Sequence, residues 1–343
     1  MSKWYEQSGE HGDIVISSRI RLARNLQDHP FPAHMSKEEK NIVAELIKSN
    51  IIIEDSIVAG QFSFLSMSEM DEIKRHAMIE RHLISPEFAA KGKGSGLLLM
   101  KDESVSIMIN EEDHIRIQVM KPGLNLIKAY ELADKIDTLI DERLNLAFDD
   151  RLGFLTECPT NLGTGMRASI MLHLPMLTEA GVMPQLLNTV SKLGFIIRGF
   201  YGEGTEAKGC IYQLSNQVTL GISEKAALEN LKGISFQIIS QENSLRKERQ
   251  NDIKLQDKIM RSLGLLKTAV IISFEEFMAY VSNIRLGVAM GYINDLSMDK
   301  INGLIISQGA GNIMLLKGKS LVSEKRDILR AENIRNALIN INI

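Results

Sequence analysis

The chain lacks several features that mark whole classes of protein. Its 343 residues include only two cysteines, Cys158 and Cys210, without CxxC spacing. This argues against a disulfide framework and a cysteine-rich zinc site and favours a reducing cytoplasm. No apolar run approaches the roughly 18 residues of a membrane span, and the N-terminus has no apolar core of a signal peptide. We therefore expect a cytoplasmic protein without membrane association.

The sequence is also poor in the usual phosphate-binding signatures and in excess positive charge. The glycine-rich stretch 91–96 does not have the spacing of a P-loop, and no GxGxxG motif occurs. The net charge of -3 argues against nucleic-acid binding through bulk positive charge, although it does not exclude a local arginine cluster. The hydrophobic content of 44% is ordinary for a globular protein, and the length predicts about two domains.

The stretch 156–167 combines unusual chemistry in one loop. Cys158 precedes Pro159, and the proline ring favours an extended conformation at the cysteine. Glycines and small polar residues follow, and their backbone N–H groups are available to a ligand. Arg167 closes the stretch, so a thiol and a guanidinium can face one pocket. The alternative is a surface turn with an inert cysteine.

Apolar periodicity predicts a series of strands and helices up to about residue 245. In a strand at 14–24, Arg19 and Arg21 point the same way, and they repel each other unless an anion lies between them or the strand is a solvated edge. We expect further strands at 104–109, 115–120, 168–174, 195–198 and 210–214. Helices are predicted at 36–50, 67–84, 125–146 and 183–193, and from Ser223 onward.

Two connections carry carboxylates. The turn 110–114 between two apolar strands contains three acidic residues, including Glu112, and carboxylates on a rigid hairpin suit cation binding or proton removal. The span 199–209 contains four glycines and Glu203. A glycine-rich loop with polar side chains is typical of loops that close over substrates. A solvated turn and an ordinary hairpin loop remain the alternatives.

After about residue 245 the sequence reads as helices only, at 244–262, 273–282, 297–307 and 322–340. We therefore predict an α+β fold, in which residues 1–245 form an antiparallel sheet flanked by helices and residues 246–343 form a small all-helical domain. In the last helix Arg326 and Arg330 lie one turn apart on the same face, and Asp327 is close enough to pair with Arg330. An exposed, salt-bridged helix is the alternative.

Five arginines stand at strand ends or in loops beside glycines and carboxylates. Together they suggest a polyphosphate site, because the guanidinium is a planar fork of donors matched to phosphate oxygens. Phosphoryl transfer requires mainly positioning and neutralisation of charge, which arginines and Mg²⁺ supply. A carboxylate pair would suit a guanidinium acceptor, which must lose a proton to become a nucleophile. The arginines are Arg19, Arg21, Arg116, Arg167 and Arg198.

The runs Asn110-Glu-Glu-Asp-His-Ile-Arg116 and Cys158-Pro-Thr-Asn-Leu-Gly-Thr164 resemble motifs of the phosphagen kinases, and the resemblance covers roughly residues 14–225. It implies an ATP-binding sheet and Mg²⁺ carried mainly on the ATP phosphates, without a protein metal site. Glu112 and Glu203 would orient and deprotonate the guanidinium, with Cys158 beside it. The implied nucleotide-binding residues are Ser18, Arg19, Arg21, His82, Arg116, Arg167 and Arg198, with His82 near the adenine.

Departures from that pattern concern the acceptor. The arginine motif begins at residue 19, so we expect no preceding helical domain of the kind that encloses small substrates. Met171 and Tyr201 stand where a histidine and a second loop arginine are usual. An open site accommodates an arginine of a protein, and the whole chain is similar to the bacterial protein-arginine kinases.

That resemblance implies phosphorylation of exposed arginines in proteins, which marks them for a Clp protease in the stress response. It also implies a zinc-binding activator protein, self-association into a homo-oligomer and allosteric control by phosphoarginine. A small-guanidine kinase and a non-catalytic phosphoarginine-binding adaptor are the alternatives. The implied phosphoarginine motif consists of Arg326, Asp327, Arg330 and Ala331.

Overall fold

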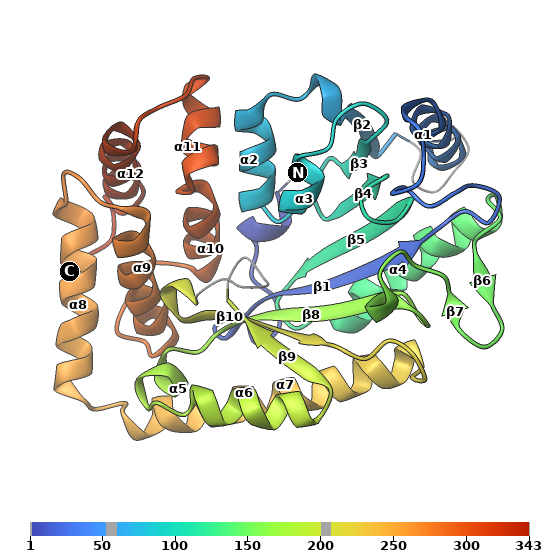
Figure 1. Ribbon diagram of the computed structural model, residues 1–343. Helices are drawn as coiled ribbons and strands as arrows, with labels where there is room; N and C mark the ends of the chain where they lie inside the picture. Colours follow the sequence, from blue (N-terminus) through green and yellow to red (C-terminus); the bar gives the residue numbers. More distant parts are fainter. Residues whose placement is uncertain (1, 53–59, 200–206, 343) are drawn as a thin grey trace.

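The computed structural model describes residues 2–52, 60–199 and 207–342 (Figure 1). A large antiparallel sheet with flanking helices forms one part of the molecule, and the last five helices gather beside it. The predicted α+β class, with an antiparallel sheet followed by a helical C-terminal region, is confirmed.

The large sheet has eight strands in the order β2-β3-β4-β5-β1-β8-β10-β9, and every neighbouring pair is antiparallel. A short hairpin, β6 and β7, stands apart from it. The strands are β1 (Val15–Arg24), β2 (Phe62–Ser66), β3 (Gly96–Met100), β4 (Val105–Ile109), β5 (Ile115–Pro122), β6 (Phe148–Asp149), β7 (Gly153–Phe154), β8 (Met166–His173), β9 (Phe195–Arg198) and β10 (Ile211–Asn216).

Many helices begin at the residues that their sequences predict. Ser36 caps α1 in a capping box with Glu39, and Ser223 caps α7. The helices are α1 (Lys37–Ile51), α2 (Glu72–Glu80), α3 (Pro86–Ala89), α4 (Leu126–Asp141), α5 (Pro175–Glu179), α6 (Met183–Lys192), α7 (Glu224–Glu248), α8 (Ile253–Thr268), α9 (Phe274–Ala289), α10 (Met298–Ser307), α11 (Ala310–Lys317) and α12 (Ser323–Ala337).

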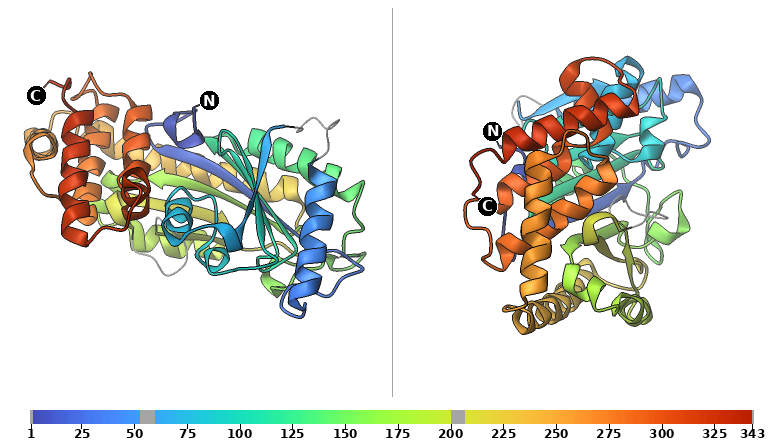
Figure 2. Two further views of the ribbon diagram at one scale, coloured as in Figure 1. Left: turned by 90° about the horizontal axis from the view of Figure 1, so that it is seen from above. Right: turned by 90° about the vertical axis from the view of Figure 1, so that its left-hand side faces the viewer.

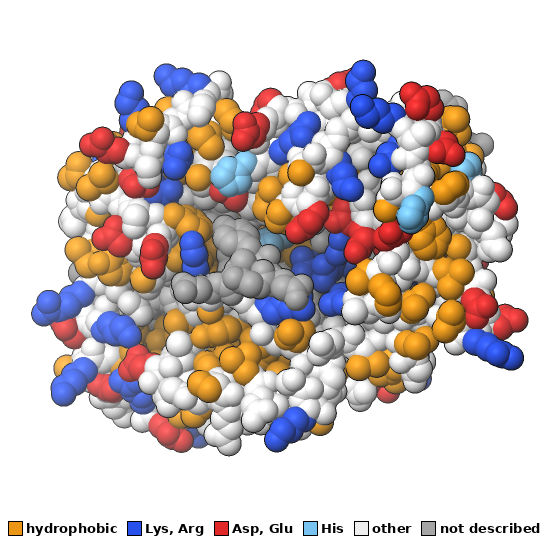
Figure 3. Space-filling view, viewed as in Figure 1, with side chains coloured by type: hydrophobic (Ala, Val, Ile, Leu, Met, Phe, Trp, Pro, Cys, Tyr) orange, Lys and Arg blue, Asp and Glu red, His pale blue; other side chains and the backbone are white. Residues whose placement is uncertain are grey.

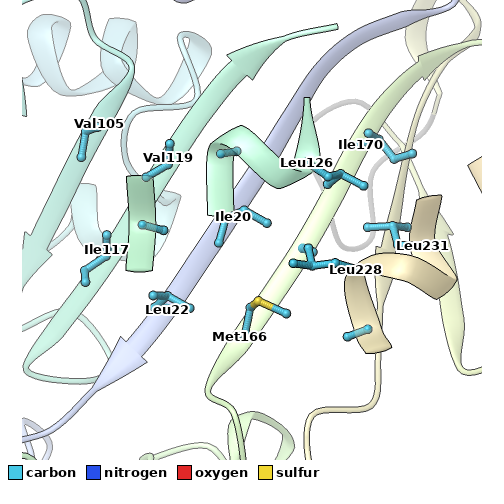
Figure 4. Close-up of a cluster of buried hydrophobic side chains, with 14 of the residues drawn as sticks. Ile20, Leu22, Val105, Ile117, Val119, Leu126, Met166, Ile170, Leu228 and Leu231 are labelled. Carbon is cyan, nitrogen blue, oxygen red and sulfur yellow. The ribbon is translucent and has the colours of Figure 1, made fainter. Parts of the chain in front are cut away.

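One face of the sheet is apolar and is covered by α4 and α7. Ile20 and Leu22 of β1 point toward Leu126 of α4 and Leu228 of α7, and the whole cluster is shielded from water (Figure 4). Full burial of each aliphatic side chain of this size contributes about 1.5–3 kcal/mol. Because side chains alternate along a strand, this packing forces Arg19 and Arg21 onto the opposite face.

The opposite face is covered at its margins. Over β3 and β4, residues of α2 and α3 form a separate apolar cluster that includes Met78 and Phe88. At another margin Ile16, Met171 and Ile211 join the core of the C-terminal helices. Figure 2 shows these helices grouped at one end of the sheet. The middle of this face carries the arginines.

Several helices begin or end at residues other than those predicted from the sequence. The helix predicted at 67–84 is shorter, because Asp71 caps α2 and the chain turns at His82 with φ 57°. The segment 244–262 is two helices, because Asp252 accepts hydrogen bonds from the first amides of α8. Neither β3 nor α11 was predicted. The proposed domain boundary after residue 245 falls within α7 and remains a prediction.

Candidate active site

The strand register brings arginines from several strands onto one face. Arg21 lies directly opposite Arg167 on β8, and Ala23 lies opposite Arg116 on β5. On β9, Arg198 is paired with Gln213 of β10 and shares this face. Opposed residues on one face have Cβ atoms about 4.5–5.5 Å apart, and like charges there are destabilising. Lys and Arg side chains meet Asp and Glu side chains near the centre of this face (Figure 3). Such a cluster of arginines favours the binding of an anion.

Arg19 and Arg21 differ in their partners. Arg19 donates to Ser169 Oγ at 3.2 Å and to Gln213 Oε1 at 2.9 Å. The Arg21 Nε atom is shielded from solvent and has no hydrogen-bond partner among the described residues. Burial, with the charge of Arg116, lowers the pKa of Arg19 to about 10. Burial and the charges of Arg19, Arg116 and Arg167 lower the pKa of Arg21 well below its usual value. A polyphosphate would offset both the repulsion and the missing acceptor.

The hairpin tip between β4 and β5 gives its three carboxylates different surroundings. Glu111 accepts from Arg116 at 2.7 Å and from Ser85 Oγ at 2.6 Å, and its burial is outweighed by these contacts, so its pKa is lowered. Asp113 is buried and accepts from Asn25 Nδ2 at 2.6 Å and from the Glu157 amide at 2.8 Å. These two carboxylates are structural.

Glu112 lies between them and is exposed. Among the described residues, none donates a hydrogen bond to its carboxylate. Burial of part of the group and the charges of Asp113 and Glu111 raise its pKa, against the opposing charges of Arg116 and Arg167. A carboxylate with a raised pKa, presented on a rigid turn beside arginines, is suited to accept a proton from a cationic acceptor.

The loop that carries Cys158 reaches the arginine face through a hydroxyl. Thr160 Oγ1 accepts from Arg167 at 3.1 Å and lies 3.1 Å from Cys158 Sγ. Because the hydroxyl accepts from Arg167, its own proton is available to the sulfur. The same loop is bound to the hairpin through the Glu157 amide. The structure therefore brings Cys158, Arg167 and the Glu112 hairpin into one neighbourhood.

A buried arginine on the helix-covered face holds this loop from behind. Arg24 donates to Thr164 O at 3.0 Å and to Asp137 at 2.6 Å. Gly165, with φ 61°, makes the approach possible, since a Cβ there would lie 2.6 Å from the Arg24 Nη1 atom. Arg24 was not among the site residues predicted from the sequence.

His82 follows α2 and is buried beside the arginine face. Its ring lies 6.4 Å from that of Trp4, and its backbone oxygen accepts from Gln118 Nε2 at 2.7 Å. Burial, together with the charge of Arg19, lowers the pKa of His82 to about 3, so the imidazole is neutral at physiological pH. A neutral, flat ring at this position is compatible with contact to a nucleotide base.

The side chain of one predicted site residue, Ser18, lies apart from this group. The Ser18 side chain points to the helix-covered face, where its hydroxyl donates to Gly123 O at 2.8 Å and accepts from the Asn125 amide at 2.9 Å. Strand alternation therefore points the Ser18 side chain away from that of Arg19, and a nucleotide-binding role of Ser18 remains a prediction. Glu203 lies outside the described residues.

The predicted phosphoarginine motif is divided between interior and surface. Arg330 is 1% exposed and donates to Gln308 O at 2.9 Å, to Ile272 O at 2.8 Å and to Asp327 Oδ1 at 2.5 Å. Ala331 is buried, whereas Arg326 and Asp327 are partly exposed. Arg330 thus links three segments of the helical region, and a ligand-binding role of the motif remains a prediction.

Several residues that hold the site together were not predicted, because only the pairing of the strands shows that they lie beside the arginines. Gln118, Ser169 and Gln213 were recognisable only as the residues that share a face with the arginines once the strands are paired. Glu111 and Asp113 stood in the motif beside Glu112, but nothing in the sequence distinguishes the three carboxylates.

Two negative observations concern the described part of the chain. In residues 2–52, 60–199 and 207–342, no three His, Cys, Asp or Glu side chains are grouped to hold a metal ion. Within the same ranges, no helix is both long and apolar enough to cross a bilayer.

Comparisons with known proteins agree with this geometry. The family model of the ATP:guanido phosphotransferase C-terminal catalytic domain matches residues 42–245, and that of the protein-arginine kinase McsB C-terminal domain matches residues 252–342. A protein-arginine kinase of Caldanaerobacter subterraneus subsp. tengcongensis is 44% identical over 328 residues, which cover 95% of this chain and 97% of that protein. The chain belongs to the protein-arginine kinase family. It is an ATP-dependent phosphotransferase of the class that acts on a guanidino nitrogen.

Another member of the family is similar over its whole length, and more distant kinases share the fold. The protein-arginine kinase of Clostridium acetobutylicum is 43% identical over 340 residues, which cover 98% of this chain and all of that protein. The crystal structure of a lombricine kinase has a TM-score of 0.62 at 25% identity and covers 71% of this chain and 70% of that one. A duplicated taurocyamine kinase from Schistosoma mansoni shares the fold, with a TM-score of 0.60 over 81% of this chain and 47% of that one at 23% identity.

Proposed function

We propose that this protein transfers the γ-phosphoryl group of ATP to the guanidinium of arginine residues in proteins. The observation that carries the proposal is the cluster of arginines on the open face of the sheet. Arg21 lies opposite Arg167 there, and the Nε atom of Arg21 has no partner among the described residues. Like charges at this spacing are stabilised when a polyphosphate lies between them. The names of the relatives, which are protein-arginine kinases, support the acceptor.

In the proposed reaction the arginines hold the nucleotide and Glu112 acts on the acceptor. The guanidinium nitrogen loses a proton to the Glu112 carboxylate and attacks the γ-phosphorus, and the bond to the β–γ bridging oxygen breaks to release ADP. The five proposed phosphate ligands are Arg19, Arg21, Arg116, Arg167 and Arg198. They supply positioning and charge neutralisation, which dominate catalysis of phosphoryl transfer.

The remaining predicted residues take supporting roles in the proposal. Cys158, beside Thr160 and Arg167, lines the acceptor side without forming a covalent intermediate. Neutral His82 contacts the adenine. Mg²⁺ accompanies the ATP phosphates and adds charge neutralisation there. Glu203 is proposed as the second carboxylate on the guanidinium.

A protein acceptor is favoured by the surface beside the Cys158 loop. Gly163 of this loop is bridged to the β6–β7 hairpin and packs against the backbone of residues 219–220. These neighbours expose large apolar side chains to solvent, and such surfaces mark sites of contact with macromolecules. The exposed residues are Phe148, Leu152, Val218 and Leu220.

The test is to incubate the purified protein with ATP, Mg²⁺ and a casein-like substrate and to map phosphate by mass spectrometry under non-acidic conditions, because the P–N bond is acid-labile. We expect phosphoarginine in the substrate and a loss of about 10²–10⁴-fold in rate for Glu112→Gln, the range of general acid–base catalysis. Phosphorylation of free arginine alone would favour a small-guanidine kinase. Phosphoarginine binding without ATP turnover would favour an adaptor.

Further properties are proposed on the family resemblance alone. These are marking of substrates for Clp-type proteolysis in the stress response, a zinc-binding activator protein, homo-oligomerisation and control by phosphoarginine at Arg326 and Asp327. A cytoplasmic location is proposed as well, and it accords with the two cysteines, both of which are free thiols. Co-purification from cells, followed by identification of the bound proteins, tests the partners.

A further inference from the structure

We propose that Glu80 is a positioning residue that makes nucleotide binding depend on the docking of the C-terminal helices. Glu80 is the last residue of α2 and is 6% exposed. Its carboxylate accepts from the Gly311 amide, the Asn312 amide and Asn312 Nδ2, each at 2.9 Å. These donors form the N-terminus of α11, so a residue of the sheet part of the molecule caps a helix of the C-terminal region.

The two helices are close enough to touch only because glycines stand at the contact. A Cβ at Gly311 would lie 2.6 Å from the Ala77 backbone nitrogen, and one at Gly309 would lie 2.3 Å from Glu80 Oε2. A buried carboxylate that loses its donors bears the full cost of desolvation. The position of α11 and the end of α2 are therefore tied to each other.

The end of α2 leads directly into the nucleotide side of the site. Arg81 follows Glu80 and donates to Glu103 Oε1 at 2.7 Å. His82 comes next, in a left-handed conformation with φ 57°, and its backbone oxygen is held by Gln118 of the arginine face. Only one residue separates Glu80 from His82. A shift of the capped helix end therefore also shifts the His82 imidazole, which lies near Arg19.

The inference rests on the proposed function in one respect, that the nucleotide occupies the arginine face beside His82. From there the coupling is reciprocal, because two sites linked by one structural element affect each other by the same free energy. Packing of α11 against the end of α2 favours nucleotide binding, and bound nucleotide should in turn stabilise this packing.

The experiment uses the full-length protein and MgADP as the probe. Glu80→Gln removes the charge of the cap, and Gly311→Ala separates the same helices without changing charge. Glu72→Gln, at an exposed position in the first turn of α2, is the matched control. We expect both interface variants to weaken MgADP binding in calorimetry by about fivefold or more, with the KM of the acceptor unchanged and Glu72→Gln like wild type.

A second measurement does not depend on the variants folding well. In wild-type protein, hydrogen exchange at the Gly311 and Asn312 amides should slow when MgADP is bound. Unchanged exchange there, or interface variants that lose thermal stability while keeping wild-type MgADP affinity, would show that Glu80 is only structural. A chain that binds MgADP with this coupling but phosphorylates no protein would refute the proposed function alone.

Discussion

Arg21 on the sheet face and Arg330 in the C-terminal helices have opposite surroundings: Arg21 is half-buried among other arginines, whereas Arg330 is almost fully buried among hydrogen-bond acceptors. In the helical region, buried Arg330 donates to two backbone oxygens and to Asp327. Arg285 is an intermediate case, because it donates to Asn302 and to the Gly12 oxygen but its buried Nε atom has no partner among the described residues. On the sheet face, Arg21 is surrounded by Arg19, Arg116 and Arg167, and its Nε atom has no described acceptor.

The comparison indicates that the neighbours of a guanidinium, as well as its burial, distinguish structural arginines from those proposed to bind the nucleotide. A guanidinium whose donors are satisfied by carbonyls holds segments together, and the fold is most stable when it is present. A guanidinium among like charges is held in place by the sheet at a cost in stability, and it recovers that cost when an anion binds. The two classes should therefore respond in opposite ways to replacement.

Replacement of Arg330 should have the largest effect on folding. Arg330→Met leaves the Gln308 and Ile272 oxygens and the Asp327 carboxylate without their donor, and breaking a buried ionic contact costs about 3–5 kcal/mol. Denaturant unfolding measures the loss, with Arg326→Met, at a partly exposed position, as the control that should lose less than about 1 kcal/mol. Equal stabilities of the two variants would contradict a structural role for Arg330.

Replacement of Arg21 should affect activity instead. Arg21→Met removes donors aimed at the proposed phosphate and should lower kcat/KM by about 10²–10³-fold, as for the loss of one transition-state donor. Its free energy of unfolding should stay the same or rise, because the repulsion among the arginines is reduced. Steady-state kinetics and denaturant unfolding together check this. A large loss of stability with little loss of activity would reverse the comparison.

The titration of the Glu112 carboxylate should affect activity and stability in opposite directions. Since the pKa of Glu112 is raised, kcat/KM should fall as pH falls through a value above the ordinary range of a glutamate. For stability, a raised pKa gives a contribution that is present below the unfolded-state value and is lost as pH rises through the folded-state value. Glu112→Gln should therefore be slightly more stable than wild type at neutral pH, and the difference should vanish in acid.

Cys158 should give the smallest effect. Its sulfur has a single described hydrogen-bond contact, with Thr160, so Cys158→Ala should lower kcat by about tenfold, equivalent to one modest hydrogen bond. Thr160→Val should act similarly, because Thr160 joins the sulfur to Arg167. Rapid-quench kinetics measures both, and a trapped phosphocysteine in wild type would overturn the assignment.

Much of the local structure was predictable because local interactions decide it. The two-residue spacing of Arg19 and Arg21 predicted a shared side of a strand, and Ser36 with Glu39 predicted the start of α1. The hairpin around Glu112 followed from two apolar strands with a polar turn. In contrast, α11 was missed because it depends on a distant partner, Glu80 of α2.

Short motifs in the sequence were enough to predict the residues that carry the chemistry, which are five arginines, a hairpin carboxylate and a cysteine loop. Which of these residues lie close together became visible only in the folded protein. Strand pairing set Arg21 against Arg167 and turned Ser18 away, and long-range contacts made Glu111 and Asp113 structural while leaving Glu112 exposed. The physical reason is that side-chain identity is local, whereas burial, like-charge proximity and hydrogen-bond satisfaction arise between segments far apart in the chain.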